Sequence, residues 1–475
     1  VRERLAACVA SGERLTPQDV GAAMHAVSKL SAADSVLPEG ERRYLLAELE
    51  RNVDGWDSLA VSSCCYAARA WSGADLQAVL AALPPRLAQA PEPFRDRHLS
   101  MALFGLSRCA DGPDTRAVLA AIAPRIAACP DDFQAQVIGN CLYGLQRCED
   151  SPEVRAVLAA LAPKIRASTA MLGAQAIGTA LYGMQRCAAG DGPEVAAIFQ
   201  ALAPKIHVSA EPLTAQAVSN ALYGLQTASD GTAVRRVLTN LAPKVAASSE
   251  PMSAQGVCNA LYGLHRLEDS LPMRAMLAAL SVKLALCSQE FEPRHISGAF
   301  MGLQRCGEST ESLAVLAALT PHIVRSSQAF PEHCVRITLY SMQGFTPKRD
   351  VAAALAALRP KVASCAEPLG PFTICSALYG LRLCAELPEA RAIVQILARA
   401  AAACPEPFSE KQVSAACMAL RLVGDCPEGR ELLGALAPRM AALDAPLNGM
   451  TVAQALSGLR GFSGGEEGRA MMEAA

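Results

Sequence analysis

The chain has 475 residues, of which 52% are hydrophobic but only 4% aromatic, and its 43 basic and 45 acidic residues leave a net charge of −2. Single hydrophobic cores stop growing at about 250–300 residues, which argues against one compact core and for a repeat array whose units pack only on their neighbours. The near-zero net charge excludes general attraction of a polyanion, so any nucleic-acid binding must depend on local rows of basic side chains.

The eighteen cysteines and seven histidines lack the spacing of a metal or disulfide site. No C-x-x-C pair occurs, and we predict no metal and no cofactor. Cys109, Cys148 and Cys187 recur 39 residues apart, and equivalent positions of stacked repeats lie about 8–10 Å apart, beyond the reach of a disulfide. We therefore expect buried thiols in a reducing compartment. No uninterrupted apolar run is long enough to predict a membrane span.

Three regions follow one another along the chain. Residues 1–90 match the repeat described below only poorly and are predicted to form divergent N-terminal capping repeats. Residues 91–463 are predicted to form a tandem helical-repeat solenoid, and residues 464–475 a C-terminal tail. The predicted fold class is all-α: an α-solenoid of about twelve two-helix repeats of 39 residues, wound as a right-handed superhelix.

The repeat is visible in a short string that ends the first helix of each unit, the A helix. Leu142-Tyr143-Gly144-Leu145-Gln146 returns as Leu181-Tyr182-Gly183-Met184-Gln185 and, further on, as Leu378-Tyr379-Gly380-Leu381-Arg382. The central small residue recurs after 39 residues in eight of eleven steps. A large apolar residue stands eleven positions before it and is predicted to anchor the start of the A helix. These anchors are Phe94, Phe133, Leu172, Leu213, Met252, Phe291, Phe330, Leu369 and Phe408.

The second helix of each unit, the B helix, begins at signals such as Ser151-Pro152-Glu153, an N-cap serine followed by a first-turn proline and an acid. Val154, Leu158 and Leu161 follow the helical period. Pro163 interrupts this run, as prolines do in several other repeats, and either a kink or a short third segment is expected there.

A helical wheel places one polar stripe on the A helix, opposite its apolar face. Amide, aromatic and guanidinium groups at one place per repeat are what readers of single strands use for base edges, base stacking and charge. The alternative interpretation is structural, with amides bonded to one another and tyrosines packed between neighbouring repeats. The predicted base-facing stripe consists of Gln136, Asn140, Tyr143, Arg147, Gln175, Thr179, Tyr182, Arg186, Gln216, Asn220, Tyr223, Gln255, Asn259, Tyr262 and Arg266.

A row of cations follows the proline of the B helix and is a candidate for contacts with successive phosphates. Its predicted members are Arg125, Lys164, Lys205, Lys244, Lys283 and Lys361. Alternatively, each cation complements the dipole of a nearby helix end. A further row, which includes Arg116, Arg155, Arg235 and Arg274, lies nine residues earlier in most repeats.

Signals of catalysis are absent apart from one nucleophile-elbow string, Gly461-Phe462-Ser463-Gly464-Gly465. That motif requires a strand before it and a helix after it, whereas here it follows an A helix, so we interpret it as a glycine-rich turn. The sequence predicts that the protein is not an enzyme and binds no small-molecule substrate.

The strings SNALYGLQ (219–226) and CNALYGLHR (258–266) resemble the core motif of octotricopeptide-repeat proteins and of the helical repeats associated with RAP domains. The resemblance covers roughly residues 91–465 and lacks the proline-rich P-P-P-E-W element of the octotricopeptide repeat. It implies an α-solenoid that binds RNA in mitochondria or chloroplasts and acts in RNA stability, processing, translation or ribosome assembly.

Two functions follow as expectations. The first is binding of single-stranded RNA in an organelle, with the stripe on the bases and one cation row on the phosphates. The second is a protein-binding scaffold or structural subunit of a large assembly, with the partner along the concave surface.

Overall fold

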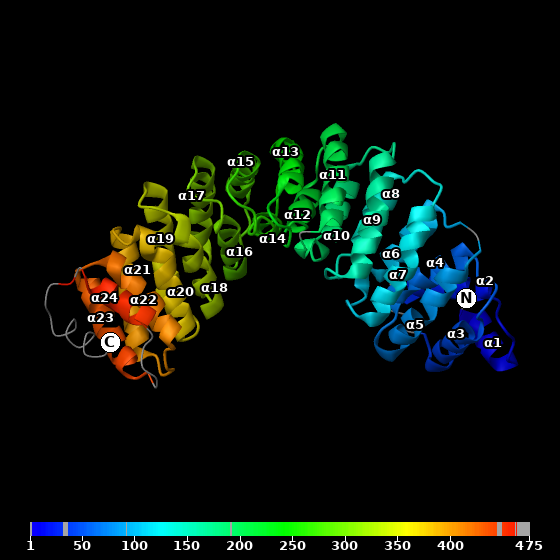
Figure 1. The fold of residues 1–475 in the computed structure, drawn as a ribbon, viewed down its shortest axis with the longest axis horizontal. Helices are drawn as coiled ribbons and strands as arrows, with labels where there is room; N and C mark the ends of the chain where they lie inside the picture. The colour runs from blue at the N-terminus through cyan, green and yellow to red at the C-terminus, as the bar shows by residue number, and fades with distance from the viewer. Residues whose placement is uncertain are drawn as a thin grey trace. The chain divides into compact units, whose positions relative to one another are not determined.

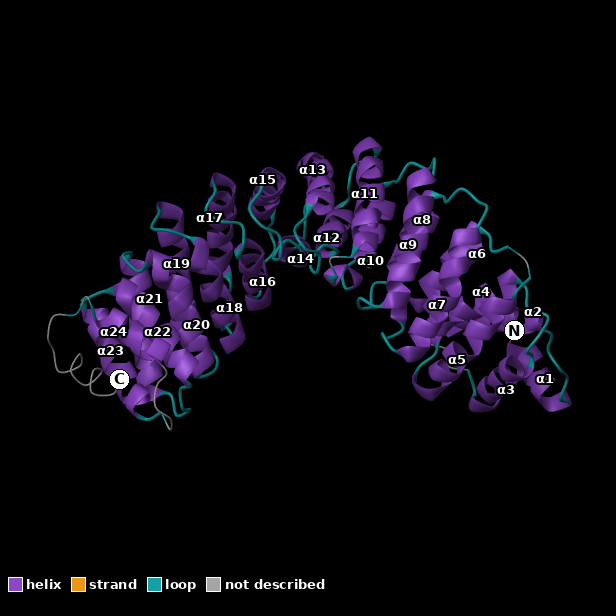
Figure 2. Ribbon diagram, in the orientation of Figure 1, coloured by secondary structure: helices purple, strands orange, loops and turns teal. Residues whose placement is uncertain are grey.

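The computed structural model describes residues 2–31, 37–91, 93–190, 192–443, 449–460 and 462. Every regular element within these ranges is a helix, and the helices pack consecutively, which confirms the all-α repeat fold (Figure 2). The predicted tail at residues 464–475 lies outside the described ranges, as does most of the glycine-rich string at 461–465. The number of repeats and the handedness stay predictions.

Contacts divide the chain into two units, Val1–Ser249 and Glu250–Ala475. In the first unit each helix packs mainly on the helix two places along the chain, so A helices form one layer and B helices another (Figure 1). The A layer contains α2 (Pro17–Ser31), α4 (Ser58–Ala67), α6 (Asp96–Gly105), α8 (Ala135–Tyr143), α10 (Ala174–Gly183) and α12 (Ala215–Tyr223). The B layer contains α1 (Arg2–Ser11), α3 (Glu39–Arg51), α5 (Gly73–Gln89), α7 (Pro113–Ala128), α9 (Pro152–Ala167), α11 (Pro193–Val208) and α13 (Thr232–Ala247).

The second unit repeats this two-layer packing. Its A helices are α14 (Ala254–Tyr262), α16 (Pro293–Leu303), α18 (Glu332–Tyr340), α20 (Pro371–Leu381), α22 (Glu410–Val423) and α24 (Gly449–Leu459). Its B helices are α15 (Leu271–Leu286), α17 (Thr310–Arg325), α19 (Arg349–Ala363), α21 (Pro388–Ala403) and α23 (Pro427–Ala441). Single 3₁₀ turns extend several A helices: η1 (Ala68–Ala70), η2 (Leu106–Arg108), η3 (Cys187–Ala189), η4 (Ser341–Gly344) and η5 (Arg382–Cys384).

The B helices continue through their prolines. Pro163 lies inside α9 and Pro204 inside α11, so no third segment forms at these positions. The predicted serine cap at the start of α9 is present, with the Ser151 hydroxyl accepting a hydrogen bond from the Val154 N–H at 3.3 Å. The B helix α9 therefore begins where the serine and proline predicted it.

The core lies between the layers and confirms the predicted anchors. All nine large apolar residues at the starts of the A helices are buried, from Phe94 to Phe408. Cys109, Cys148 and Cys187 are buried free thiols, and burial raises the pKa of Cys109 to about 11. These cysteines act as small core residues.

The central glycine of the repeat allows close approach of consecutive A helices. A methyl group added at Gly183 would overlap the carbonyl oxygen of Leu142 in α8, and one at Gly224 would overlap that of Leu181 in α10. In the second unit, Gly380 meets the carbonyl of Leu339 in the same way. A glycine at this position brings adjacent stripes closer together than any larger residue would permit.

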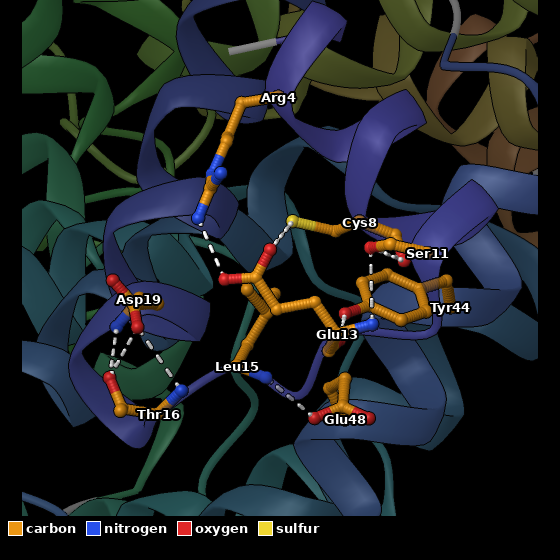
Figure 3. Close-up of polar contacts among 9 residues, drawn as sticks. All are labelled: Arg4, Cys8, Ser11, Glu13, Leu15, Thr16, Asp19, Tyr44 and Glu48. Atoms are coloured by element: carbon orange, nitrogen blue, oxygen red, sulfur yellow. Dashed lines mark hydrogen bonds and ion pairs between the residues drawn. The ribbon is translucent and has the colours of Figure 1, made fainter.

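Polar contacts hold the turn between α1 and α2 against α3 at the N-terminal end (Figure 3). Arg4 pairs with Glu13 at 2.8 Å, and the Leu15 N–H donates to the Glu48 carboxylate at 3.1 Å. Since α2 packs on α4 and α3 on α5, residues before 91 follow the same two-layer packing as the later repeats. Their role as a cap stays a prediction.

Candidate nucleic-acid interface

The tyrosines of the stripe form a column of stacked rings in the first unit. Tyr182 stacks between Tyr143 and Tyr223, with ring centroids 5.9 Å apart and planes 24° apart on each side. The column continues toward the N-terminus from Tyr143 through Phe104 at 5.5 Å to Tyr66 at a further 6.0 Å. A neighbouring tyrosine thus covers each face of the Tyr182 ring. This arrangement matches the alternative interpretation, in which tyrosines pack between neighbouring repeats, and it leaves only ring edges for a ligand.

The amides of the stripe divide into exposed and half-buried members. The four predicted glutamines at the starts of α8, α10, α12 and α14 are exposed, whereas the residues four positions later are half-buried. The Gln216 side-chain amide donates to the Asn220 side-chain oxygen at 2.8 Å within α12, and Asn140 donates to the Ser100 hydroxyl at 3.2 Å. Thr179 donates instead to the backbone oxygen of Gln175. Gln255 and Asn259 repeat the first pairing at 2.6 Å in α14 of the second unit.

Arginines end the stripe and are exposed. Arg147, Arg186 and Arg266 were predicted, and Arg108 and Arg305 stand at the equivalent position in their repeats, a signal that sequence reasoning missed. The five residues are hereafter the A-end arginine row. Arg147 donates one guanidinium N–H to the Arg108 carbonyl at 3.1 Å, and Arg186 lies 4.0 Å from Glu149. Most of the donors of Arg147 thus remain directed to solvent.

A polar groove of about 890 Å³ brings parts of the stripe together in the first unit. Arg147, Arg186, Tyr182 and Tyr223 line it, so the structure assembles predicted residues from three repeats. Three glutamines that directly precede the arginine position also line the groove: Gln146, Gln185 and Gln226. They were not predicted as site residues, although their recurrence in the LYGLQ string was a signal that could have identified them. Asp111 and Glu149 lie in the same lining.

The groove glutamines are linked across repeats. The Gln226 side-chain amide donates to the Gln185 side-chain oxygen at 3.2 Å, and the Gln146 amide donates to the Ser107 carbonyl at 3.0 Å. Gln185 is buried, whereas Gln146 and Gln226 are half-buried. Such bonds fix the orientation of the amides and leave each with unused donors or acceptors that a base edge can meet.

Most cations of the predicted phosphate row on the B helices contact backbone carbonyls of the preceding repeat, and their role toward phosphates stays a prediction. Lys205 of α11 donates to the Ser168 carbonyl at the end of α9 at 2.6 Å, and Arg125 donates to the Leu87 carbonyl of α5 at 2.8 Å. Lys164, Lys244 and Lys361 donate to the carbonyls of Cys129, Ser209 and Ser326, the residues that end the preceding B helices. Lys283 is buried. These carbonyl contacts place five cations at the C-terminus of the preceding B helix, where a positive charge stabilises a helix: Arg125, Lys164, Lys205, Lys244 and Lys361.

The earlier arginine row on the B helices is paired with acids. Arg155 donates two hydrogen bonds to Asp150, at 2.8 Å and 2.5 Å, and this contact holds the pKa of the Asp150 carboxyl below its ordinary value. The same five-residue spacing recurs in the pairs Arg116–Asp111, Arg235–Asp230, Arg274–Asp269 and Arg430–Asp425. Of these three rows of cations among the described residues, the A-end arginine row therefore makes the weakest hydrogen bonds and ion pairs with other groups of the protein.

No protein-family model and no curated protein matches the sequence. Among solved structures, a homology model of the full-length AP-3 complex in an intermediate open conformation shares 13% identity over 97% of this chain and 82% of that chain, with a TM-score of 0.43. The pentatricopeptide repeat protein PPR10 in complex with an 18-nt psaJ RNA element shares 15% identity over 93% of this chain and 61% of that chain, with a TM-score of 0.29.

The structure of APUM23 with GGAGUUGACGG shares 12% identity over 99% of this chain and 95% of that chain, with a TM-score of 0.24. With scores this low, these likenesses carry no argument about what this chain binds. Among the described residues, no helix combines the length and the apolar character needed to cross a lipid bilayer.

Proposed function

We propose that this protein is a non-catalytic helical-repeat protein that binds single-stranded RNA in a mitochondrion or chloroplast. The observation that carries the proposal is the groove of the first unit, where exposed Arg147 and Arg186 meet Tyr182, Tyr223 and the groove glutamines. The organelle follows only from the resemblance to octotricopeptide-type repeats.

The chemistry of the groove suits a flexible polyanion with planar bases. A guanidinium group binds a phosphate through two parallel hydrogen bonds and also stacks on a base. Side-chain amides donate to and accept from base edges, and single strands expose those edges. Asp111 and Glu149 in the same lining would repel continuous phosphate contact, which favours a strand whose phosphates meet the arginines at separate points.

The test is the affinity of the full chain for a labelled pool of single-stranded RNA, measured by fluorescence anisotropy at several salt concentrations. Arg147→Glu with Arg186→Glu reverses two charges in the groove. The matched control, Arg166→Glu with Arg236→Glu, reverses two equally exposed charges on α9 and α13 of the B layer.

We expect at least a tenfold loss of affinity in the groove variant, and a salt dependence in the parent chain that the groove variant largely loses. The control should bind as the parent does. Equal losses in both variants would assign the binding to net charge alone, and absence of binding at low salt would contradict the proposal.

A further inference from the structure

In α20, α22 and the turn that follows α20, apolar residues replace polar ones at several positions of the stripe. Where the A-end arginine row would continue, Leu383 and Leu422 stand, exposed by 42% and 43%. Met418 takes the position of the stacked tyrosines and is 41% exposed, and Phe372 takes that of the leading glutamine and is 60% exposed. Phe372 lies at the start of α20, Leu383 in the η5 turn that follows α20, and Met418 and Leu422 in α22. Because α20 and η5 both pack on α22, these exposed apolar side chains come from adjacent elements, and the four residues are hereafter the apolar patch.

Basic side chains border the apolar patch. Arg336 of α18 holds its guanidinium carbon 5.1 Å from the centre of the Phe372 ring, and Arg382 lies 3.9 Å from that of Tyr379. Lys411 and Arg421 of α22 are exposed, with Lys411 two helical turns before Met418, and Arg421 donates a hydrogen bond to the Ser457 hydroxyl of α24 at 3.4 Å. The acidic residues of α18, α20 and α22 are Glu332 and Glu410, at the first positions of α18 and α22.

Arginines lie over the rings of Phe372 and Tyr379, so less aromatic surface is left for base stacking, which disfavours RNA as the occupant of the patch. Tyr379 has Arg382 over its ring and stacks on Tyr340 at a centroid distance of 6.0 Å. Bases bind single-strand readers by stacking on free aromatic or guanidinium faces, and leucine and methionine side chains offer neither. What the patch offers is aliphatic surface, which is stabilised by burial against another apolar surface.

We propose that the apolar patch is a docking surface for an amphipathic helix of a partner protein that carries acidic residues beside its apolar face. Leucine and methionine side chains on neighbouring helices accept the apolar face of such a helix. The bordering cations complement its acids, and this charge complementarity fixes orientation and excludes basic partners. In a two-fold contact through this patch, the basic border of one copy would face the basic border of the other, so self-association is disfavoured.

The probe is a synthetic amphipathic peptide of about 18 residues, with leucines at helical spacing on one face and glutamates beside them. A second peptide carries lysine in place of every glutamate. Binding of each peptide to the full chain is measured by fluorescence anisotropy. The test variant is Leu383→Ser with Leu422→Ser, and the matched control is Val282→Ser with Leu286→Ser, two exposed apolar residues of α15 in the B layer.

The expected result is binding of the acidic peptide to the parent and control chains, with at least a tenfold loss in the Leu383/Leu422 variant, whose thermal midpoint should equal that of the parent. Equal affinity for the lysine peptide would overturn the proposal, as would equal losses in both variants or no binding to the parent chain. Concentration-dependent dimers that the Leu383/Leu422 variant abolishes would assign the patch to a second copy. Loss of RNA affinity in this variant would assign it to RNA, and either result overturns the proposal.

Discussion

The A helices α8 and α10 of the first unit and α20 and α22 of the second unit share a backbone arrangement but present different surfaces, whereas α14 of the second unit and the turn after it keep the amide, tyrosine and arginine stripe. In α8, α10 and the turns that follow them, the stripe is amide, tyrosine and arginine, and in α20 and α22 it becomes phenylalanine, methionine and leucine. A methyl group added to the central glycine would overlap a carbonyl oxygen of the preceding A helix in the same way at Gly183 and at Gly380. Packing requirements hold the scaffold constant, whereas the exposed positions vary without cost to the core, so the two regions can serve different ligands.

The shared scaffold predicts the largest effect. Replacing Gly183 or Gly380 with alanine places a methyl group on a backbone carbonyl that cannot move without shifting its helix. We expect each substitution to lower the free energy of unfolding by about 3 kcal/mol, at the upper end of the cost of overpacking. Chemical denaturation measures this loss.

Gly112→Ala is the control for both glycines, because a methyl group there meets no atom within 4 Å. Its stability should stay within about 0.5 kcal/mol of the parent. If Gly380→Ala cost as little stability as this control, consecutive A helices would not approach each other as closely in the second unit as in the first.

Exchanging the exposed residues tests the functional difference itself. Arg147→Leu with Arg186→Leu should weaken RNA binding about tenfold, which is about 1.4 kcal/mol, and should reduce the salt slope by about 1.4 if both arginines contact phosphates. The reciprocal change, Leu383→Arg with Leu422→Arg, should not weaken RNA binding and should weaken binding of the acidic peptide, because the apolar contact of both leucines is lost. Electrophoretic mobility shifts at two salt concentrations distinguish these outcomes, and a reduced RNA affinity in the second variant would contradict the assignment of different ligands to the groove and the apolar patch.

The lysine caps should matter equally in both units. Lys205→Met in the first unit and Lys361→Met in the second keep the aliphatic stem but remove a charged donor from the end of the preceding B helix. We expect a loss of about 1 kcal/mol in each, measured by urea denaturation. RNA affinity should be unchanged. A drop in affinity without a drop in stability would instead support the phosphate role predicted from sequence.

The smallest expected effect concerns the aspartate–arginine pairs. Hydrogen bonds from Arg155 and Arg274 lower the pKa values of Asp150 and Asp269 in the folded chain. A lowered folded pKa contributes stability that is complete above the unfolded value of about 3.9 and is lost as the pH falls through the folded value.

Asp150→Asn and Asp269→Asn should each cost about 0.2–1 kcal/mol at pH 7, because the arginine partners are half exposed. The difference from the parent should shrink as the pH falls below about 4 and should disappear once the pH lies below the lowered folded pKa values of the two aspartates. Denaturation midpoints at pH 7 and pH 3.5 provide the comparison. A difference that grew on acidification would contradict the assignment.

Much of the fold was predictable from the sequence because it depends on local patterns. The 39-residue period is visible in the sequence itself. The anchors from Phe94 to Phe408 and the serine cap at Ser151 depend on contacts within one repeat, and the structure confirms that the anchors are buried and that the cap forms. The polar stripe was predictable from the helical period alone, and four of its fifteen residues line the groove of the first unit: Arg147, Tyr182, Arg186 and Tyr223. The sequence also showed the glycine recurrence, although not the carbonyl that each glycine approaches.

Only the tertiary structure decided how each row of charges is used. Lys205 and Arg155 are both basic residues of B helices at repeating positions, yet one caps the helix before it and the other pairs with Asp150. The partner of Lys205 lies 37 residues away in sequence and is a backbone oxygen, which no side-chain pattern reveals. Likewise, the neighbour of the Tyr182 ring is a tyrosine of the next repeat. Such contacts arise between repeats, so they depend on how the units stack rather than on the pattern within any one of them.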